Sequence, residues 1–188
     1  MVRPELPESA ETFVAMLRGI NVGGKHILPM EDLVAMFRNA GGSDARAYIQ
    51  SGNVVFRASP RAARRVPALV EVAIANQYGF PARVVLRTAT ELDALATRNP
   101  FVQADSDIGK LHVAFLADLP RQELVAALDP NRSAPDEFAV RGREIYLRLP
   151  NGVARTKLTN QYFDTMLSTT STVRNWRTVL KLLELAKA

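Results

Sequence analysis

The sequence predicts an α+β protein built from two similar halves. Each half is expected to be a ferredoxin-like unit, with a mostly antiparallel sheet and helices packed on one of its faces. Short apolar runs of strand length alternate with segments that have the period of helices. The same order of elements occurs twice. The first strand of each half shows the repeat, since residues 13–17 match residues 112–116 at an offset of 99. We therefore expect one half in residues 1–100 and the other in residues 101–188, as two domains or as one integrated domain.

The first half begins, after a tail at residues 1–11, with a strand at residues 13–17. A glycine-containing loop follows, and Pro29 suits the first turn of a helix whose apolar residues recur with helical spacing. Two strands, at residues 45–49 and 53–57, are expected to form a hairpin around a tight turn.

The rest of the first half predicts a second helix, a strand and a short third helix. The second helix opens at Ser59-Pro60 and closes at Gly79, with its regular part expected from about Val66. The strand covers residues 82–87, and the short helix at 90–96 follows a threonine that can cap it.

The second half repeats this order up to its last strand. We expect a strand at residues 111–116, a helix from Pro120 to Leu128, and a hairpin of residues 138–140 and 144–149. A helix at about residues 155–167 and a hydroxyl-rich loop at 168–172 are expected next, and a final helix at 173–186. The first half is thus predicted as βαββαβ and the second as βαββαα.

The composition excludes several classes of protein. Hydrophobic residues make up 47% and charged residues 23%, as in ordinary globular chains. No apolar run approaches the length of a membrane span, and residues 1–8 do not resemble a secretory signal, so we expect a cytoplasmic protein with no membrane contact. The absence of cysteine excludes disulfides and thiolate sites. We predict no metal site and no cofactor, since the two histidines do not cluster with carboxylates.

Polar residues of the first half are predicted to converge at one edge of its sheet. A right-handed crossover makes the first and second strands parallel, with the third strand between them. The end of the first strand, with Arg18 and Asn21, then lies beside the hairpin turn, with Gln50, Ser51 and Asn53. Such a convergence favours a binding site. The alternative is that the asparagines and the serine only shape turns.

The loop after the first strand has the spacing G-x-x-x-x-G-K from Gly19 to Lys25. His26 stands where a nucleotide-binding loop needs serine or threonine, and three residues intervene before the helix. We therefore expect an anion held by the backbone N–H groups around Gly23 and Gly24 and by Lys25, rather than a nucleoside triphosphate. The alternative is a glycine turn needed only for its geometry.

The C-terminal region is basic, and the chain as a whole carries a net charge of +5. Arg174 and Asn175 are predicted at the start of the last helix, where an anion is favoured. The alternative there has Trp176 in the core and the arginines in solvent. The basic excess also leaves open non-sequence-specific nucleic-acid binding through this region, although the aromatic motif of RNA-recognition modules is absent. A scaffold that binds a protein partner is the third alternative.

Three segments resemble the signatures of a known family. They are residues 17–25 (LRGINVGGK), 48–56 (YIQSGNVVF) and 172–179 (TVRNWRTV). They are similar to those of the bacterial domain of unknown function 1697 family, and the likeness extends over about residues 12–186. Thr156 stands where the family pattern has serine. The resemblance implies an α+β fold with an internal duplication, and it implies no activity, cofactor or catalytic residue.

Together these patterns predict a binding protein or an enzyme for a small anionic ligand, phosphate- or nucleotide-like, at the glycine-rich loop. No general base stands out, so the sequence assigns no reaction, and it assigns no oligomeric state. The predicted ligand-binding residues are Arg18, Asn21, Gly23, Gly24, Lys25, Gln50, Ser51, Asn53, Arg174 and Asn175.

Overall fold

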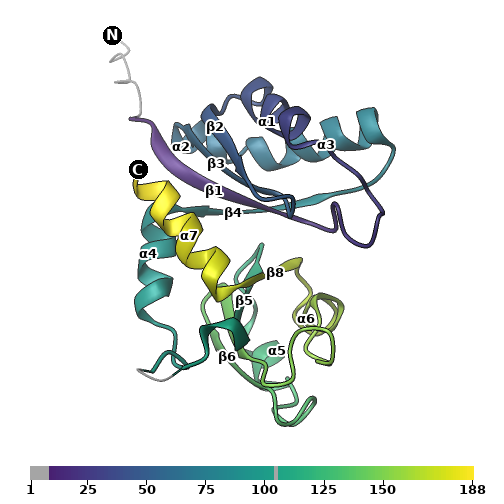
Figure 1. The fold of residues 1–188 in the computed structure, drawn as a ribbon, viewed down its shortest axis with the longest axis vertical. Coiled ribbons are helices and arrows are strands. Elements are labelled where there is room, and N and C mark those ends of the chain that lie inside the picture. The colour runs from purple at the N-terminus through teal and green to yellow at the C-terminus, as the bar shows by residue number, and fades with distance from the viewer. Residues whose placement is uncertain (1–8, 104–105) are drawn as a thin grey trace.

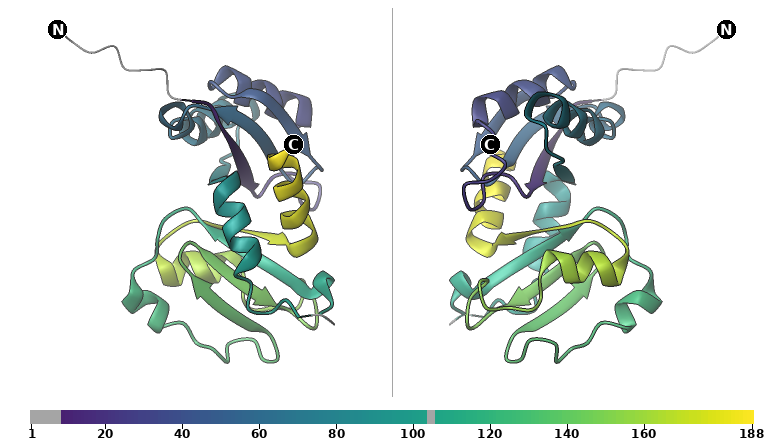
Figure 2. Two further views of the ribbon diagram at one scale, coloured as in Figure 1. Left: turned by 90° about the vertical axis from the view of Figure 1, so that its left-hand side faces the viewer. Right: turned by 90° about the vertical axis from the view of Figure 1, so that its right-hand side faces the viewer.

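The computed structural model describes residues 9–103 and 106–188, so most of the tail predicted at residues 1–11 lies outside it. Within the described residues the chain forms two four-stranded antiparallel sheets and seven α-helices, which confirms the α+β class. The two sheets lie one above the other in Figure 1, and the side views show helices on their outer faces and between them (Figure 2).

The first sheet has the order β2-β3-β1-β4. Its strands are β1 (Glu11–Arg18), β2 (Ser43–Tyr48), β3 (Asn53–Ala58) and β4 (Arg83–Thr88). β3 is antiparallel to both β1 and β2, so β1 and β2 run parallel, as the crossover rule predicts. The backbone N–H of Leu17 donates to the carbonyl of Gly52 at 2.7 Å. The end of β1 therefore lies beside the β2–β3 turn.

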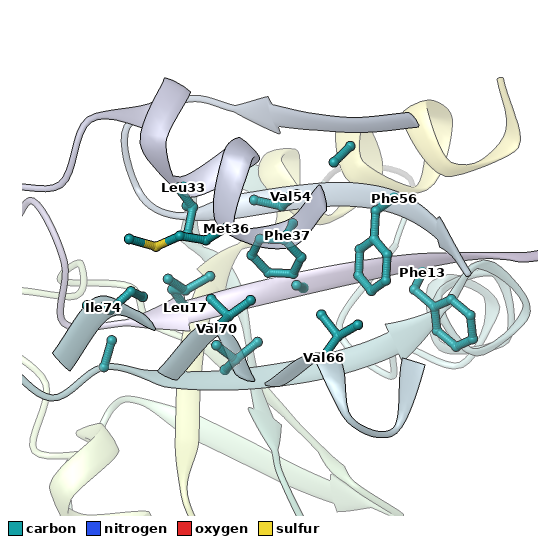
Figure 3. Packing of buried hydrophobic residues seen from close by; sticks show 14 of the residues in the cluster. Phe13, Leu17, Leu33, Met36, Phe37, Val54, Phe56, Val66, Val70 and Ile74 are labelled. Carbon is teal, nitrogen blue, oxygen red and sulfur yellow. The ribbon is translucent and has the colours of Figure 1, made fainter. Parts of the chain in front are cut away.

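The outer face of this sheet is covered by α1 (Met30–Asn39), α2 (Pro60–Ala63) and α3 (Val66–Tyr78). Leu33, Met36 and Phe37 recur at helical spacing in α1, and all three are buried against the sheet (Figure 3). α3 ends at Gly79, which has a left-handed φ of 73°. The local signals for these helices therefore agree with the structure.

The second sheet has the order β6-β7-β5-β8 and is also antiparallel throughout. Its strands are β5 (Leu111–Leu116), β6 (Glu137–Arg141), β7 (Glu144–Arg148) and β8 (Ser171–Asn175). Two short helices, α5 (Gln122–Ala126) and α6 (Asn160–Leu167), pack on its outer face around the buried Phe163. Both are shorter than predicted, and α6 begins after Thr159, whose hydroxyl accepts a hydrogen bond from the backbone of Tyr162.

The largest error of the sequence prediction concerns β8. Residues 171–175 were expected as the end of a loop and the start of a helix, and they form an edge strand paired with β5. Two neighbouring β-branched residues, Thr172 and Val173, suit a strand. The last helix, α7 (Trp176–Lys187), begins only after Asn175, whose side-chain oxygen accepts from the backbone N–H of Arg177 at 3.0 Å.

The prediction that helices cover only one face of each sheet is also wrong. α4 (Ala89–Thr97) and α7 lie side by side between the two sheets (Figure 2). One buried cluster contains Val14 of β1, Val113 of β5 and Trp176 of α7. Both faces of β1 are therefore buried, and every residue from 13 to 17 is inaccessible to solvent. The two sheets share this core.

Candidate functional site

Four of the ten predicted ligand-binding residues line one cleft of about 290 Å³. They are Arg18 at the end of β1, Ser51 in the β2–β3 turn, Arg174 in β8 and Asn175 at the start of α7. The cleft thus lies where the end of the first sheet meets the edge strand of the second. Asn160, Thr172 and Thr178 add polar groups to its wall.

Asn21 and Asn53 stand behind the cleft and shape it. Asn21 accepts from the backbone N–H of Leu28 at 2.8 Å and donates to the carbonyls of Leu28 and Gln50 at 3.0 Å, which closes the loop after β1 and ties it to the hairpin. Asn53 is fully buried and donates to the carbonyl of Tyr48 at 3.2 Å. Both asparagines therefore make backbone contacts of the kind that the turn-shaping alternative predicts.

The remaining predicted residues, Gly23, Gly24, Lys25 and Gln50, lie outside the cleft lining. Within the described chain, the amino group of Lys25 has no hydrogen-bonding or ionic partner. The loop is held by His26, which bonds the carbonyl of Gly19 at 2.9 Å and stacks on Phe80 at 4.5 Å. Because α1 begins at Met30 rather than directly after the loop, the loop does not adopt the strand–loop–helix arrangement of a nucleotide-binding loop.

Arg174 is the buried centre of the site. Its Nε donates to Asn53 Oδ1 at 2.6 Å, its Nη2 to the carbonyls of Leu17 at 2.6 Å and Ser51 at 3.2 Å, and its Nη1 to Thr172 Oγ1 at 2.8 Å. Its Nη1 also donates to the carbonyl preceding it in the chain, at 2.9 Å. All these acceptors are neutral. Burial lowers the pKa of Arg174 to about 10, and no carboxylate of the described residues offsets this effect.

The other arginine of the cleft is already neutralised by the protein. Arg18 forms an ion pair with Asp164 of α6. The second carboxylate oxygen of Asp164 accepts from the backbone N–H and the hydroxyl of Ser171, both at 2.7 Å. Among the described residues, no acidic side chain lines the cleft itself, so the charge of Arg174 remains uncompensated there.

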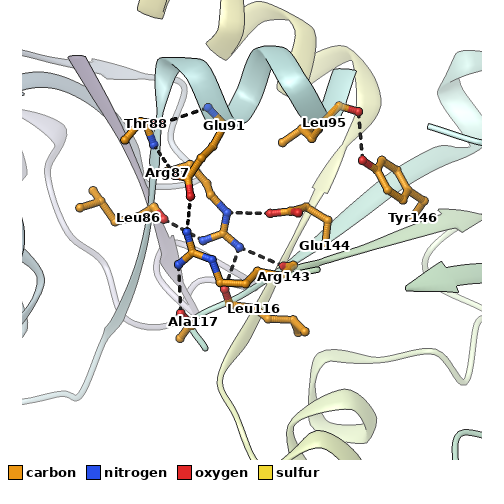
Figure 4. Close-up of polar contacts among 10 residues, drawn as sticks. All are labelled: Leu86, Arg87, Thr88, Glu91, Leu95, Leu116, Ala117, Arg143, Glu144 and Tyr146. Atoms are coloured by element: carbon orange, nitrogen blue, oxygen red, sulfur yellow. Dashed lines mark hydrogen bonds and ion pairs between the residues drawn. The ribbon is translucent and has the colours of Figure 1, made fainter. Parts of the chain in front are cut away.

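A second buried arginine, Arg87 of β4, was not predicted as a functional residue (Figure 4). Its Nε donates to Glu144 Oε1 at 2.8 Å, and its Nη2 donates to the carbonyls of Leu116 at 2.8 Å and Arg143 at 2.9 Å. Glu91 lies beside it and forms an ion pair with Arg143. The sequence signal for this cluster is a charged residue directly after the apolar run Val84–Leu86, in a strand that must be buried.

Arg87 and Arg174 occupy equivalent positions in the two sheets. Arg87 lies opposite Val14 in the pairing of β4 with β1, and Arg174 lies opposite Val113 in the pairing of β8 with β5. Val14 and Val113 are 99 positions apart, which is the offset on which the predicted duplication was based.

Each of these arginines binds the opposite half of the molecule. The arginine of β4 reaches the carbonyl of Leu116 at the end of β5, and the arginine of β8 reaches the carbonyl of Leu17 near the end of β1. Each Nε binds the side chain that begins the second hairpin strand, Glu144 in one case and Asn53 in the other. The contacts are reciprocal, but the side chain that accepts from Nε is a carboxylate for Arg87 and a neutral amide for Arg174.

Metal-ligand clusters, membrane-spanning helices and the buried His112 are the remaining features on which the sequence bears. Across residues 9–103 and 106–188, no three His, Asp or Glu side chains are grouped closely enough to share a metal ion. No helix in these ranges has both the length and the apolar character needed to cross a membrane. His112 is buried in β5, where burial lowers its pKa below 6.5 although a hydrogen bond to the carbonyl of Lys110 opposes this.

Comparisons with known proteins bear on family and fold. The model of a family described as "Protein of unknown function (DUF1697)" matches residues 10–146. The fold is similar to the structure of the conserved bacterial protein SP0830 from Streptococcus pneumoniae, with a TM-score of 0.74 and 21% sequence identity. That similarity covers 96% of this chain and 100% of the other, and at this identity it shows the fold alone. No curated protein matches the sequence.

Proposed function

The chain belongs to the DUF1697 family, whose name assigns no activity, and from the geometry of the cleft we propose that it binds a small anionic ligand beside Arg174. One observation carries the proposal: a buried guanidinium without a carboxylate partner adjoins an open cleft. A buried charge lowers stability unless an opposite charge lies near it. An anion in the cleft supplies that charge.

The cleft limits the size of the ligand. About 290 Å³ is close to the lower bound of roughly 300 Å³ for small-molecule pockets, so a phosphate or a small metabolite fits it better than a whole nucleotide. The N–H groups of Arg174 already have acceptors, so its contribution to binding is its charge. The hydroxyls of Ser51 and Thr178 are the groups that contact the ligand in this proposal.

We propose binding rather than catalysis. Among the described residues that line the cleft, the two arginines are the only titratable side chains, and arginine is a poor proton donor or acceptor.

We also propose that both halves are ferredoxin-like units related by an internal duplication. The identical strand orders and the equivalent registers of the two arginines support this relation. Each half then also ends in a helix, α4 or α7, that follows its last strand directly.

The test compares anion binding by two variants of one residue. Arg174→Gln removes the charge, and Arg174→Lys keeps it while losing part of the hydrogen bonding, so both variants should be less stable. We expect at least one small anion, inorganic phosphate or acetate, to raise the Tm of the wild-type protein and of Arg174→Lys, but not that of Arg174→Gln, with adenosine monophosphate as the larger probe. At 100 times its Kd, a ligand stabilises the folded state by about 2.7 kcal/mol. Equal shifts in Arg174→Gln would contradict the proposal.

Lys25→Ala is the matched control outside the cleft, and we expect it to bind the same anions as the wild type. The nucleic-acid alternative loses part of its basis, because Arg174 is buried while Lys181 and Lys187 form ion pairs with Glu184 and Asp93. A Tm shift with short oligonucleotides only, which disappears as salt rises, would favour that alternative.

A further inference from the structure

A second cleft, of about 490 Å³, lies at Arg87 and is built from positions equivalent to those of the first. Four residues of the second cleft are followed, 87 positions later in each case, by four residues of the first. The pairs are Leu86 and Val173, Arg87 and Arg174, Thr88 and Asn175, and Glu91 and Thr178. One cleft can therefore serve as a template for the other.

The two clefts differ in where the negative charge comes from. At Arg87 the protein supplies two carboxylates, Glu144 on the guanidinium and Glu91 beside it. The equivalent positions near Arg174 hold the neutral residues Asn53 and Thr178. The cleft that lacks its own carboxylates is the one proposed to bind an anion.

The carboxylate of Glu91 shows which groups bind an anion at this position of the second cleft. One of its oxygens accepts from the backbone N–H of Thr88 at 2.8 Å, and the other receives the guanidinium of Arg143. Asn175 is the residue equivalent to Thr88, and Thr178, at the position of Glu91, has no carboxylate that could accept from the backbone N–H of Asn175. In the first cleft, a threonine therefore stands at the position where the second cleft has a carboxylate.

We propose that the ligand is a small carboxylic acid whose carboxylate takes, beside Arg174 and Asn175, the position that Glu91 takes beside Arg87 and Thr88. This inference rests on the proposed function and narrows the ligand class. A monoanion matches the single uncompensated charge of the cleft, whereas a phosphate dianion exceeds it. The rest of the acid extends towards Ser51 and Thr172, which line the same cleft.

The test places the missing carboxylate on the protein. Thr178→Glu copies Glu91, so we expect it to raise the Tm of the ligand-free protein by a few degrees and to weaken acetate or propionate binding at least about tenfold. Thr178→Gln is the matched control, since it has nearly the same size and no charge. We expect Thr178→Gln to have a lower Tm than Thr178→Glu, because filling the cleft alone leaves the arginine uncompensated.

The reciprocal variant opens the second cleft. Glu91→Thr copies Thr178, and we expect it to lower the Tm and to make the Tm rise with added acetate more steeply than in the wild type.

The outcomes separate the two proposals. Binding of phosphate or adenosine monophosphate without binding of acetate or propionate would overturn the carboxylate inference and leave the proposed function standing. Acetate binding by Thr178→Glu as tight as that of the wild type would also overturn the inference alone. If the wild-type protein bound none of these anions, both proposals would be overturned.

Discussion

Single side chains of this protein decide how charge is distributed between two equivalent positions. Arg87 and Arg174 make the same kinds of contact, and only the residues around them determine whether the charge is balanced. Asn53 is the clearest example, because it is fully buried and its amide oxygen accepts a hydrogen bond from Arg174 Nε at 2.6 Å. A neutral acceptor satisfies the geometry of the guanidinium and leaves its charge unchanged.

Asn53→Ala should destabilise the protein, because it leaves a charged donor buried without an acceptor. We expect a loss of about 1–3 kcal/mol in the free energy of unfolding, measured by urea denaturation. Asn53→Asp is the informative counterpart, since it gives Arg174 the carboxylate that Arg87 already has. Asn53→Asp should be more stable than Asn53→Ala at neutral pH, and equal stability would show that charge compensation is unimportant at this position.

Glu91 should make stability depend on acidic pH. Burial raises its pKa, but the hydrogen bond from Thr88 and the charges of Arg143 and Arg87 outweigh burial and lower the pKa below 4.5. A carboxylate with a lowered folded-state pKa stabilises the protein above its unfolded-state pKa, and this contribution disappears as the pH falls through the folded-state value. Wild type should therefore exceed Glu91→Gln in stability at pH 7, and the two should converge once the pH has fallen below the lowered folded-state pKa. A difference that persisted at acidic pH would contradict this assignment.

At the scale of elements, turns and strands fix how closely the segments of the site approach one another. Gly52 has a φ of 73°, and a Cβ built on it would lie 2.7 Å from Ile20 Cδ1 and 2.9 Å from Leu17 Cβ. The hairpin turn can therefore approach the end of β1 only with glycine at this position. The same approach places the carbonyl of Ser51 within reach of Arg174.

Gly52→Ala and Gly79→Ala form a matched pair. Both glycines have a φ of 73°, but nothing lies within 4 Å of the Cβ position of Gly79. We expect Gly79→Ala to cost about 1–2 kcal/mol for the left-handed backbone alone. Gly52→Ala should cost about 1–3 kcal/mol more because of the clash, measured by the same denaturation experiment. Equal costs would mean that the close approach relaxes without penalty.

Elements with strong local signals could be predicted from the sequence, and elements that depend on distant partners could not. The strand over residues 111–116 and the helix ending at Gly79 agree with the structure, because apolar runs and a left-handed glycine mark them locally. β8 was missed because Ser171–Asn175 is short and polar, and its partner β5 lies far away in the sequence. Arg18 and Ser51 were placed near one another by topology, whereas the burial of Arg174 depends on β8 and could not be foreseen.

At the scale of the whole molecule, the two sheets and the two helices between them share one buried core. Trp176 is the only tryptophan of the chain and lies in the core that both sheets share. Its fluorescence therefore reports on the contact between the halves, while far-UV circular dichroism reports on both sheets. The two signals measure different parts of the same structure.

We expect the two signals to give coincident thermal transitions, because unfolding of either half exposes the core that both halves share. The measurement is a parallel melt of the full chain, followed by fluorescence and by circular dichroism. A fluorescence transition several degrees below the circular-dichroism transition would show that the halves separate before they unfold.

We expect the covalent link between the halves to be dispensable, because reciprocal arginine contacts and a shared core also join them. Arg87 and Arg174 each cross to the opposite half, and Val14 and Val113 meet in one core, so side chains rather than the connecting segment join the halves. The molecule therefore suits fragment complementation. Two polypeptides divided between α4 and β5 should each expose their part of the shared core when alone and should assemble into the native fold when co-expressed.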